Sequence, residues 1–405
     1  MKNISRYLLV LASLLFITCS KLLPPLPDND QVLDGPVDGL NSQENARFLA
    51  GDIAFNDMVF TKENGLGPYF VATSCGSCHA GDGKGHPSTT LTRFGQYDST
   101  GNLFMAFGGP QLQNKAIPGF IPELIPSGAP HANFTPPANT GLGFLAALTD
   151  AQIMANADEF DSDGDGISGV PNYISAPSFF IPSAIHTAYG GKYIGRFGKK
   201  AAAIDLLHQT VNAYNQDMGI TSIFSPNEPG INGVLSPYGD GVPDPEVASS
   251  TVLDVVFYLR TLKAPVQRNQ TGGDVIAGKE IFISLKCGSC HTPEWTTGSS
   301  DIEALANKTF YPYTDLLLHD MGNDLDDGYT EGMAKTSEWK TPALWGLGLA
   351  KNSQGGSYYL MHDGRATSIE QAILLHQGEG LYSRNQYSIL SAGDKEKLIK
   401  FLESL

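Results

Sequence analysis

Basic residues are scarce in this sequence: its 405 residues include 26 Lys and Arg against 42 Asp and Glu, which gives a formal net charge of −16. Binding to nucleic acid depends on Lys and Arg side chains that displace counterions from phosphates. The composition therefore argues against a nucleic-acid partner. An acidic surface suits a basic protein partner, although the same charge also serves simply to keep a protein soluble.

Cysteine is equally scarce. Apart from Cys19, the chain has four cysteines, and all of them lie in two copies of one five-residue sequence, CGSCH, at Cys75–His79 and Cys287–His291. No thiol remains for a separate disulfide.

The apolar run from Tyr7 to Ile17 is too short to span a bilayer comfortably, and Lys2 and Arg6 precede it. This pattern is typical of a secretory signal. Cys19 follows in a context that resembles the bacterial lipobox, so we expect lipidation there and a location on the periplasmic side of the cell envelope. Simple cleavage and an uncleaved anchor are the alternatives.

Three chemistries use a CxxC pair. A thioredoxin-like redox pair needs a βαβ setting, and a zinc site uses two CxxC pairs at closer spacing, but neither explains the His after each pair. In c-type haem attachment, two thiols bond the porphyrin and the next His binds the iron. We therefore predict two covalently bound haem c groups, one at Cys75, Cys78 and His79 and one at Cys287, Cys290 and His291.

The 45 Gly and 25 Pro indicate many turns and loops. A helical pattern runs from Val275 to Leu285, before the second motif, and Ser391 can cap a closing helix. The apolar face of that last helix consists of Leu398, Phe401, Leu402 and Leu405. Further helices are expected over residues 46–60, 204–211 and 251–262.

The predicted fold class is mainly α, with two cytochrome c-like haem domains and long Gly/Pro-rich loops. We expect a signal peptide over residues 1–19 and a tether over 20–45. The first haem domain is then residues 46–270, and the second is residues 271–405.

One loop carries a calcium pattern. Asp161, Asp163 and Asp165 stand at positions one, three and five, with glycine at six and Ile167 offering its carbonyl at seven, as in an EF-hand loop. Position twelve is Asn172, where the full motif has Glu. We predict a structural Ca²⁺ site of moderate affinity, with a solvated acidic turn as the alternative.

Longer motifs are similar to a known family. They are Tyr311–Gly322, Glu338–Pro342, His362–Ala366, Ile194–Gly198, Asp217–Ser222 and Asp161–Gly169. Together with the two CxxCH motifs, they resemble the di-haem oxidoreductase family of peroxidase-type proteins, from about residue 46 to the C-terminus. That family is in turn similar to the bacterial di-haem cytochrome c peroxidases and to the enzyme that matures methylamine dehydrogenase.

The resemblance implies an exported oxidoreductase that reduces hydrogen peroxide or a related oxidant. One haem, expected to be the one bound by His79, has an open iron position. The other has both axial positions filled and passes on electrons from a donor such as a small cytochrome or a cupredoxin. The alternative is an electron-transfer cytochrome without catalysis, which Ala146 favours, because many relatives have an acidic residue there.

The resemblance also suggests site residues. His376 falls where the relatives have a methionine as sixth ligand of the second haem; Met361 and Met321 compete for that role, and a bond from His376 to a haem propionate is the alternative.

In place of an acid at Ala146, the substitutes for the catalytic acid–base group are Gln111, Gln113 and Glu123. His86 is a candidate ligand of the first haem, and a loop histidine is its simpler interpretation.

Overall fold

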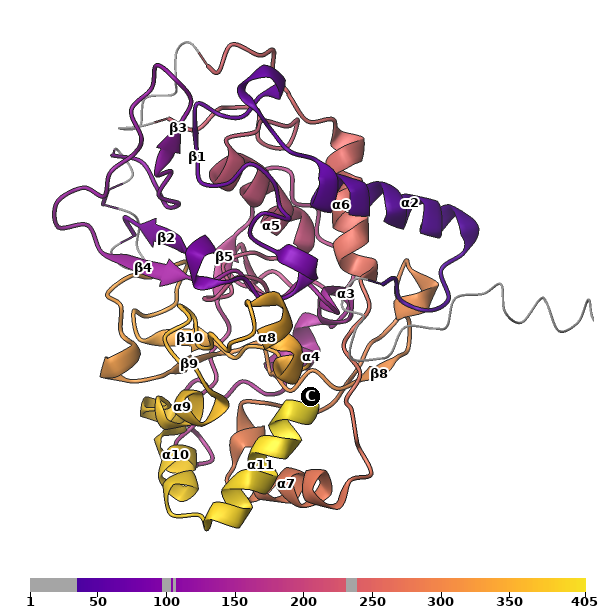
Figure 1. Cartoon of the computed structure of the whole chain (residues 1–405), viewed down its shortest axis with the longest axis vertical. Helices are drawn as coiled ribbons and strands as arrows, with labels where there is room; N and C mark the ends of the chain where they lie inside the picture. Colours follow the sequence, from indigo (N-terminus) through magenta and orange to yellow (C-terminus); the bar gives the residue numbers. More distant parts are fainter. Residues whose placement is uncertain (1–34, 97–102, 105–106, 231–238) are drawn as a thin grey trace, which may run out of the picture. The chain divides into compact units, whose positions relative to one another are not determined.

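The computed structural model describes residues 35–96, 103–104, 107–230 and 239–405. The predicted signal peptide, Cys19 and part of the tether therefore lie outside the described residues. These described residues belong to one compact unit. It is helix-rich with small sheets and long loops (Figure 1).

The α-helices are short. Their bounds are α2 Ser42–Asp52, α3 Leu142–Ala146, α4 Asp150–Met154, α5 Leu206–Asn212, α6 Ser249–Thr261, α7 Gly273–Ser284, α8 Ala350–Ser353, α9 Ile369–Leu374, α10 Leu381–Ser388 and α11 Ala392–Ser404. Single π-helical turns extend α2 over Ile53–Asp57 and α5 over Ala213–Asp217. No helix of the described residues is long and apolar enough to cross a membrane.

The strands form two-stranded antiparallel sheets. The pairs are β1 Tyr69–Phe70 with β3 Lys115–Ala116, β2 Leu91–Phe94 with β4 His131–Phe134, β5 Tyr173–Ser175 with β6 Lys192–Ile194, β7 Trp295–Thr296 with β8 Thr309–Phe310, and β9 Leu318–Asp320 with β10 Glu338–Lys340. These small sheets brace the loops between the helices.

Two close helix crossings recur in the fold. A Cβ atom added at Gly51 of α2 would lie 2.2 Å from the carbonyl oxygen of Asp254 in α6. A Cβ atom at Gly278 of α7 would lie 2.1 Å from the carbonyl oxygen of Lys397 in α11. Glycine lets the two backbones approach this closely. In each pair, the first helix is the one that precedes a CGSCH motif.

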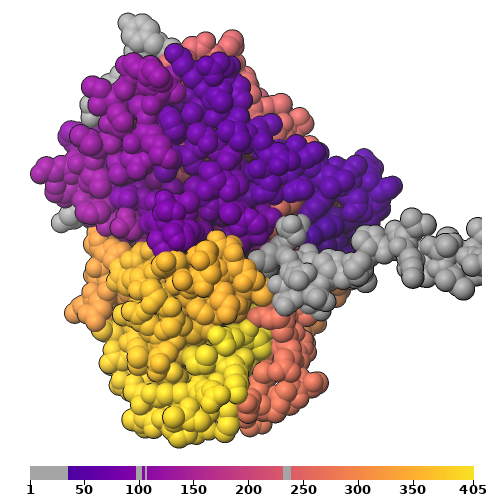
Figure 2. Space-filling model, in the orientation of Figure 1, coloured from indigo at the N-terminus to yellow at the C-terminus, as the bar shows by residue number. Residues whose placement is uncertain are grey.

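Each crossing has its own hydrophobic cluster. The first cluster joins α2, α5 and α6, and Cys75 packs against it. The second joins α7, α9 and α11, and Cys287 packs against it. On the face drawn in Figure 2, residues of the early chain gather on one half and residues of the late chain on the other. The haem domains 46–270 and 271–405 remain a prediction.

The helices expected from local patterns are present. Ser391 caps α11 by accepting a hydrogen bond from the Asp394 amide, and all four residues of its predicted apolar face are buried. The first helix differs from its predicted range. It begins earlier, because Asn41 and Glu44 form a capping box, and it ends where Met58 takes an extended backbone.

We expect Gly278→Ala to lower the free energy of unfolding by about 1–3 kcal/mol, because the methyl group must push α7 away from α11. Gly273→Ala in the same helix is the control, since a Cβ there meets nothing within 4 Å. It should be neutral or stabilise the protein by up to about 1 kcal/mol, through helix propensity. Denaturant unfolding of both variants measures the difference, and equal effects would contradict the crossing argument.

Candidate functional site

Both CGSCH motifs open onto one cavity of about 530 Å³. Its wall includes the thiols and the histidine of each motif, which are Cys75, Cys78, His79, Cys287, Cys290 and His291. Most of the remaining wall consists of apolar side chains. One largely apolar space therefore reaches two sites that lie far apart in the sequence.

The first motif closes as a tight turn. The amides of Cys78 and His79 both donate to the carbonyl of Cys75, at 3.1 and 3.0 Å. The His79 ring donates from Nδ1 to the carbonyl of Pro137, at 3.0 Å. Burial lowers the pKa of His79 to about 4, so the ring is neutral at neutral pH. Its Nε2 is then the nitrogen available to a metal.

The second motif repeats this arrangement. The His291 amide donates to the carbonyl of Cys287, and the His291 ring donates from Nδ1 to the carbonyl of Tyr313, both at 3.0 Å. Burial and the neighbouring His376 lower the pKa of His291 to about 4. Both motif histidines are therefore neutral, oriented imidazoles with Nε2 available as a donor.

The thiols do not resemble a redox pair. Burial raises the pKa of Cys75 and of Cys287 to about 12, whereas a reactive CxxC pair has a lowered pKa. Within the described residues, no group of potential metal ligands contains both CxxC pairs, as a shared zinc site would require. The structure therefore favours neither alternative to haem attachment.

His376 lies just beyond α9, whose first turn is capped by Ser368. Its Nδ1 donates to the carbonyl of Ala372 at 2.7 Å, and burial lowers the pKa of the ring. The ring centroids of His376 and His291 are 6.5 Å apart. His376 is thus a third neutral imidazole held through Nδ1.

The spacing of this pair suits a metal ion between the rings. Two metal–nitrogen bonds of about 2.0 Å, each extended by roughly 1.1 Å to a ring centre, would separate two imidazole centroids by about 6.2 Å. Among the described residues, the ring that lies beside His79 is Phe55 rather than a second imidazole. Phe282 lies beside His291 in a similar way, with ring centroids 6.4 Å apart, so the motifs differ in that a second imidazole is near His291 and, among the described ring contacts, none is near His79.

The competing methionines also line the cavity. Met321 packs against the cluster that contains Phe134 and Trp339, and Met361 packs against the same cluster and against the cluster of α7 and α11. The contact with the His291 ring distinguishes His376 from both of them.

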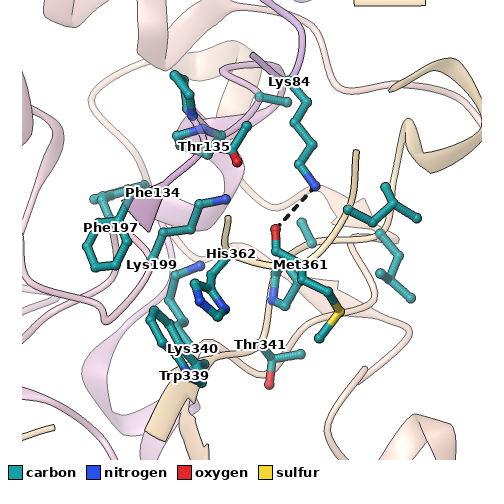
Figure 3. A pocket seen from close by; sticks show the side chains of 18 of the residues that line it. Lys84, Phe134, Thr135, Phe197, Lys199, Trp339, Lys340, Thr341, Met361 and His362 are labelled. Carbon is teal, nitrogen blue, oxygen red and sulfur yellow. Dashed lines mark hydrogen bonds between the residues drawn. The ribbon is translucent and has the colours of Figure 1, made fainter. Parts of the chain in front are cut away.

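Three lysines point into the cavity region shown in Figure 3: Lys84, Lys199 and Lys340. Lys84 donates to the carbonyl of Met361 at 3.4 Å. Within the described part of the chain, none of the three forms an ion pair with a carboxylate. Burial lowers the pKa of Lys84 and Lys340 to about 8, and that of Lys199 further. An ammonium group that is shielded from water and has no ion-pair partner is costly, so an anion inside the cavity would stabilise these three lysines.

Residues 133–405, about two thirds of the chain, match the family described as "Di-haem oxidoreductase, putative peroxidase". The chain belongs to this di-haem oxidoreductase family. The cavity fits the cofactor that the family name specifies, because a haem combines an apolar ring with anionic propionates. The neutral imidazoles match the haem iron, and the apolar walls match the ring. The three lysines, which form no ion pair with a described carboxylate, match the propionates.

Solved structures give low overall similarity. Hydrazine synthase from Kuenenia stuttgartiensis, in a crystal pressurised with xenon, is 14% identical with a TM-score of 0.41, over 94% of this chain and 93% of that one. A MauG-like protein associated with microbial copper homeostasis is 13% identical with a TM-score of 0.40, over 95% and 94% of the two chains. No curated protein matches the sequence.

Two family-like motifs of this di-haem oxidoreductase meet at the cavity wall. Trp339 stacks on His362, with ring centroids 3.6 Å apart and planes 9° from parallel (Figure 3). The Nζ of Lys200 lies over the Trp339 ring, 3.9 Å from its centroid. His362 Nε2 is 2.7 Å from a carboxylate oxygen of Asp327. The motifs therefore build a rigid wall.

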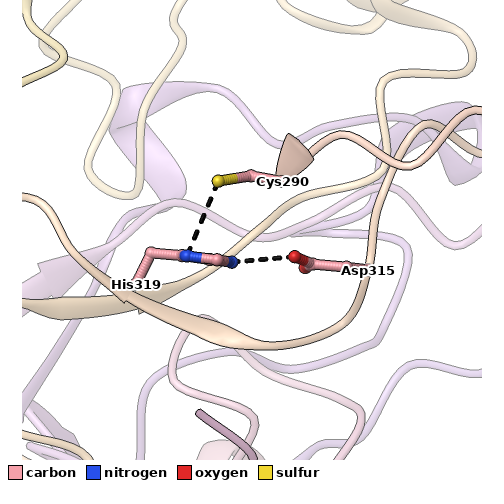
Figure 4. Close-up of side chains that lie close together, drawn as sticks. All are labelled: Cys290, Asp315 and His319. Carbon is pink, nitrogen blue, oxygen red and sulfur yellow. Dashed lines mark hydrogen bonds and ion pairs between the residues drawn. The ribbon is translucent and has the colours of Figure 1, made fainter. Parts of the chain in front are cut away.

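A charged network lies beside the second motif (Figure 4). His319 Nε2 is 2.8 Å from Asp315 Oδ2, and its Nδ1 is 2.6 Å from Glu379 Oε2 and 3.5 Å from the sulfur of Cys290. Burial alone would lower the pKa of His319, but Asp315 and these hydrogen bonds raise it well above its usual value. His319 is therefore an imidazolium held between two carboxylates. The four-residue spacing of Asp315 and His319 is the signal in the sequence that could have revealed this pair.

The structure places a different acid in the cavity from those predicted. Asp217 lines the wall near the first motif, and burial raises its pKa to about 7, although Arg93 lowers it in part. Arg93 forms an ion pair with Glu331 and donates to Gln216 at 3.2 Å. Asp217 begins the family-like motif Asp217–Ser222, but nothing in its local sequence indicates an acid–base role.

The predicted catalytic residues Gln111, Gln113 and Glu123 do not line this cavity. Their polar atoms form hydrogen bonds with backbone groups: Glu123 accepts from the amides of Gly109 and Gln113, at 3.1 and 2.8 Å. Gln111 and Gln113 donate to backbone carbonyls. Their assignment as acid–base groups therefore has no support from their positions.

His86 also lies away from the cavity wall. It caps the turn Pro87–Thr89 by accepting from the Ser88 amide at 3.1 Å. Its geometry matches the simpler interpretation, a loop histidine.

The predicted calcium loop is an exposed, tightly turned segment. Carboxylate oxygens of Asp158, Asp161 and Asp163 lie within 4.8 Å of one another, whereas Asp165 is outside this group and accepts from the Ile167 amide at 2.9 Å. Asp158 was missed because it precedes the motif. At position twelve, buried Asn172 instead braces the interior by donating to the carbonyls of Lys200 and Glu331.

If His376 binds the iron, His376→Ala should make the second haem high-spin, because it removes one imidazole ligand. His376→Met should keep it low-spin and raise its reduction potential, since thioether stabilises ferric iron less than imidazole does. Met361→Leu is the control and should leave spin state and potential unchanged. Absorption spectra with a redox titration measure both. A low-spin second haem with an unshifted potential in His376→Ala would show that the assignment is wrong.

Proposed function

We propose that this protein is an exported di-haem c oxidoreductase that reduces hydrogen peroxide, or a related oxidant, with electrons relayed between two haems. The observation that carries the proposal is that both CGSCH motifs open onto one cavity. Cys75 and Cys78 hold the first haem through thioether bonds, and Cys287 and Cys290 hold the second. Bound haem supplies one-electron redox chemistry and, at an open iron position, a site for peroxide.

The two haem sites would have different roles, one in electron transfer and one in reaction with the oxidant. His291 and His376 would hold the second haem iron, which suits electron transfer. His79 would hold the first haem iron, and the oxidant would react at this first site. The described contacts support this division, because His291 has a second imidazole, His376, near its ring, whereas no described ring contact of His79 is with an imidazole.

Other residues position the cofactors and move protons. Lys84, Lys199 and Lys340 bind propionates, which supplies the anions that these buried ammonium groups lack. Asp217 is the acid–base group. Reduction of one peroxide to two waters takes two electrons from the donor and two protons, so a carboxyl that titrates near neutral pH is suited to hold one of those protons.

The proposal also covers the two halves of the fold, the location of the protein, its electron donor and its Ca²⁺ site. The helix pairs α2 with α6 and α7 with α11 are the cores of two cytochrome c-like halves. Lipidation at Cys19 anchors the protein on the periplasmic side of the envelope, and a small cytochrome or cupredoxin donates electrons. Ca²⁺ binds at Asp158, Asp161 and Asp163. That loop is joined to the second haem site because Ser168 donates to Glu379, which contacts His319.

Absorption spectra of the haems, with and without added ligands, test the proposed function. The wild-type protein should contain two haems by the pyridine haemochrome assay, and cyanide, carbon monoxide or peroxide should change the spectrum of one of them. Steady-state assays with a reduced donor should then show peroxide consumption. Two haems with no response in either the oxidised or the mixed-valence form would instead identify an electron-transfer cytochrome.

Asp217 gives a pH prediction. Its carboxyl is protonated below its pKa of about 7 and ionised above it. If the ionised form accepts a proton from peroxide, kcat/KM should rise as the pH passes through about 7. Asp217→Asn should abolish that rise and lower kcat/KM by about 10² to 10⁴-fold. Glu123→Gln, a change at a carboxyl outside the cavity, is the control and should retain the wild-type profile; a normal profile in Asp217→Asn would exclude the role.

A further inference from the structure

A second carboxylate cluster lies outside the haem cavity. Oxygen atoms of Glu228, Asp240 and Glu246 lie within 4.8 Å of one another. Glu228 and Asp240 are only 8% and 6% exposed. Unlike the Asp158–Asp163 loop, this cluster is enclosed by protein.

Each carboxylate leaves one oxygen without a partner. The Asp240 amide donates to Glu228 Oε1 at 3.1 Å, the Val242 amide to Asp240 Oδ1 at 2.7 Å, and the Thr221 amide to Glu246 Oε2 at 2.6 Å. The other oxygens, Glu228 Oε2, Asp240 Oδ2 and Glu246 Oε1, are buried and accept no hydrogen bond from the part of the chain that the structure describes. Buried carboxylate oxygens of this kind are costly unless something positive reaches them.

The described surroundings offer no compensating charge. No Lys, Arg or His in the described residues forms an ion pair with the cluster. A fourth carboxylate, Asp244, accepts from the Thr221 hydroxyl, which also lies 2.6 Å from Glu246. Burial raises the pKa of Glu228 and raises that of Glu246 to about 7. Three acids thus share one site, with exposed Asp244 close by, and no described cationic side chain forms an ion pair with them.

The backbone also keeps space beside the cluster. At Gly239, with φ at +54°, an added Cβ would lie 2.8 and 3.0 Å from the two carboxylate oxygens of Glu228. A side chain at this position would therefore displace the Glu228 carboxylate. Glycine lets the chain turn here while the oxygens stay together.

We propose that Glu228, Asp240 and Glu246 bind a divalent cation, Ca²⁺. The group presents oxygen ligands only, which suits a hard cation rather than zinc or copper. Ca²⁺ takes six to eight oxygens and tolerates irregular geometry, so three carboxylates with water or backbone carbonyls can satisfy it. This site is separate from the EF-hand-like loop and does not depend on the haem function.

The cation would stabilise one wall of the haem cavity. Glu246 binds Thr221, which closely follows Gln216, Asp217 and Met218, all of which line the cavity. Glu246 also packs against Gly65, where an added Cβ would lie 2.2 Å from its Cγ. Cross-linking these segments through a metal would hold Asp217 in place.

The test compares two variants of the full chain with its haems. Glu228→Gln/Asp240→Asn removes two ligand charges from the enclosed cluster, and Asp161→Asn/Asp163→Asn alters the exposed loop. Each protein is freed of metal with a chelator, then titrated calorimetrically with Ca²⁺ and, separately, with Mg²⁺. Melting temperatures are measured with and without Ca²⁺.

The enclosed-cluster variant should lose one Ca²⁺ per chain, or bind it about 100-fold more weakly, and its melting temperature should no longer respond to that ion. Without metal, it should melt no lower than the wild type, because like charges have been removed. The loop variant should retain the enclosed site. Unchanged Ca²⁺ affinity and stoichiometry in the enclosed-cluster variant would overturn the proposal, as would a loop variant that binds no Ca²⁺. If the double variant does not fold, Glu246→Gln and the loop variant decide by the same criteria.

Discussion

Two half-buried imidazoles, His79 and His291, are the constraint on which the rest of the structure depends. Each is fixed through Nδ1 by a backbone carbonyl, and burial keeps each neutral. This leaves Nε2 of each ring to face a cavity rather than water. The apolar wall, the uncompensated lysines and the two glycine helix crossings surround that cavity, and they make sense as the enclosure of two haems.

The two sites share a motif but differ in their surroundings. His291 has a second imidazole, His376, at a distance suited to a metal between the rings. The charged network at His319 contacts the sulfur of Cys290 in the same motif. The first site instead has Asp217 and Arg93 in its wall. Under the proposed function, the same motif in different surroundings would allow one chain to combine electron storage at one haem with chemistry on an oxidant at the other.

Local patterns predicted local structure well. The cap at Ser391 and the apolar face of α11 follow from residues a few positions apart, so their prediction is confirmed. The acid–base candidates had no such local basis. Gln111, Gln113 and Glu123 use their polar atoms in hydrogen bonds with backbone groups, whereas Asp217 lines the cavity, where burial raises its pKa although Arg93, distant in sequence, lowers it in part.

The sequence by itself determined the family, the helix-rich class and the two predicted haem attachment sites, because all the reacting atoms of a CGSCH motif lie within five consecutive residues. Only the tertiary structure decided which other residues meet. Glu228, Asp240 and Glu246 carry no recognisable spacing, yet folding brings their oxygens together and removes water from them. Such a site depends on distance and desolvation, and both are set by long-range packing rather than by neighbours in the chain.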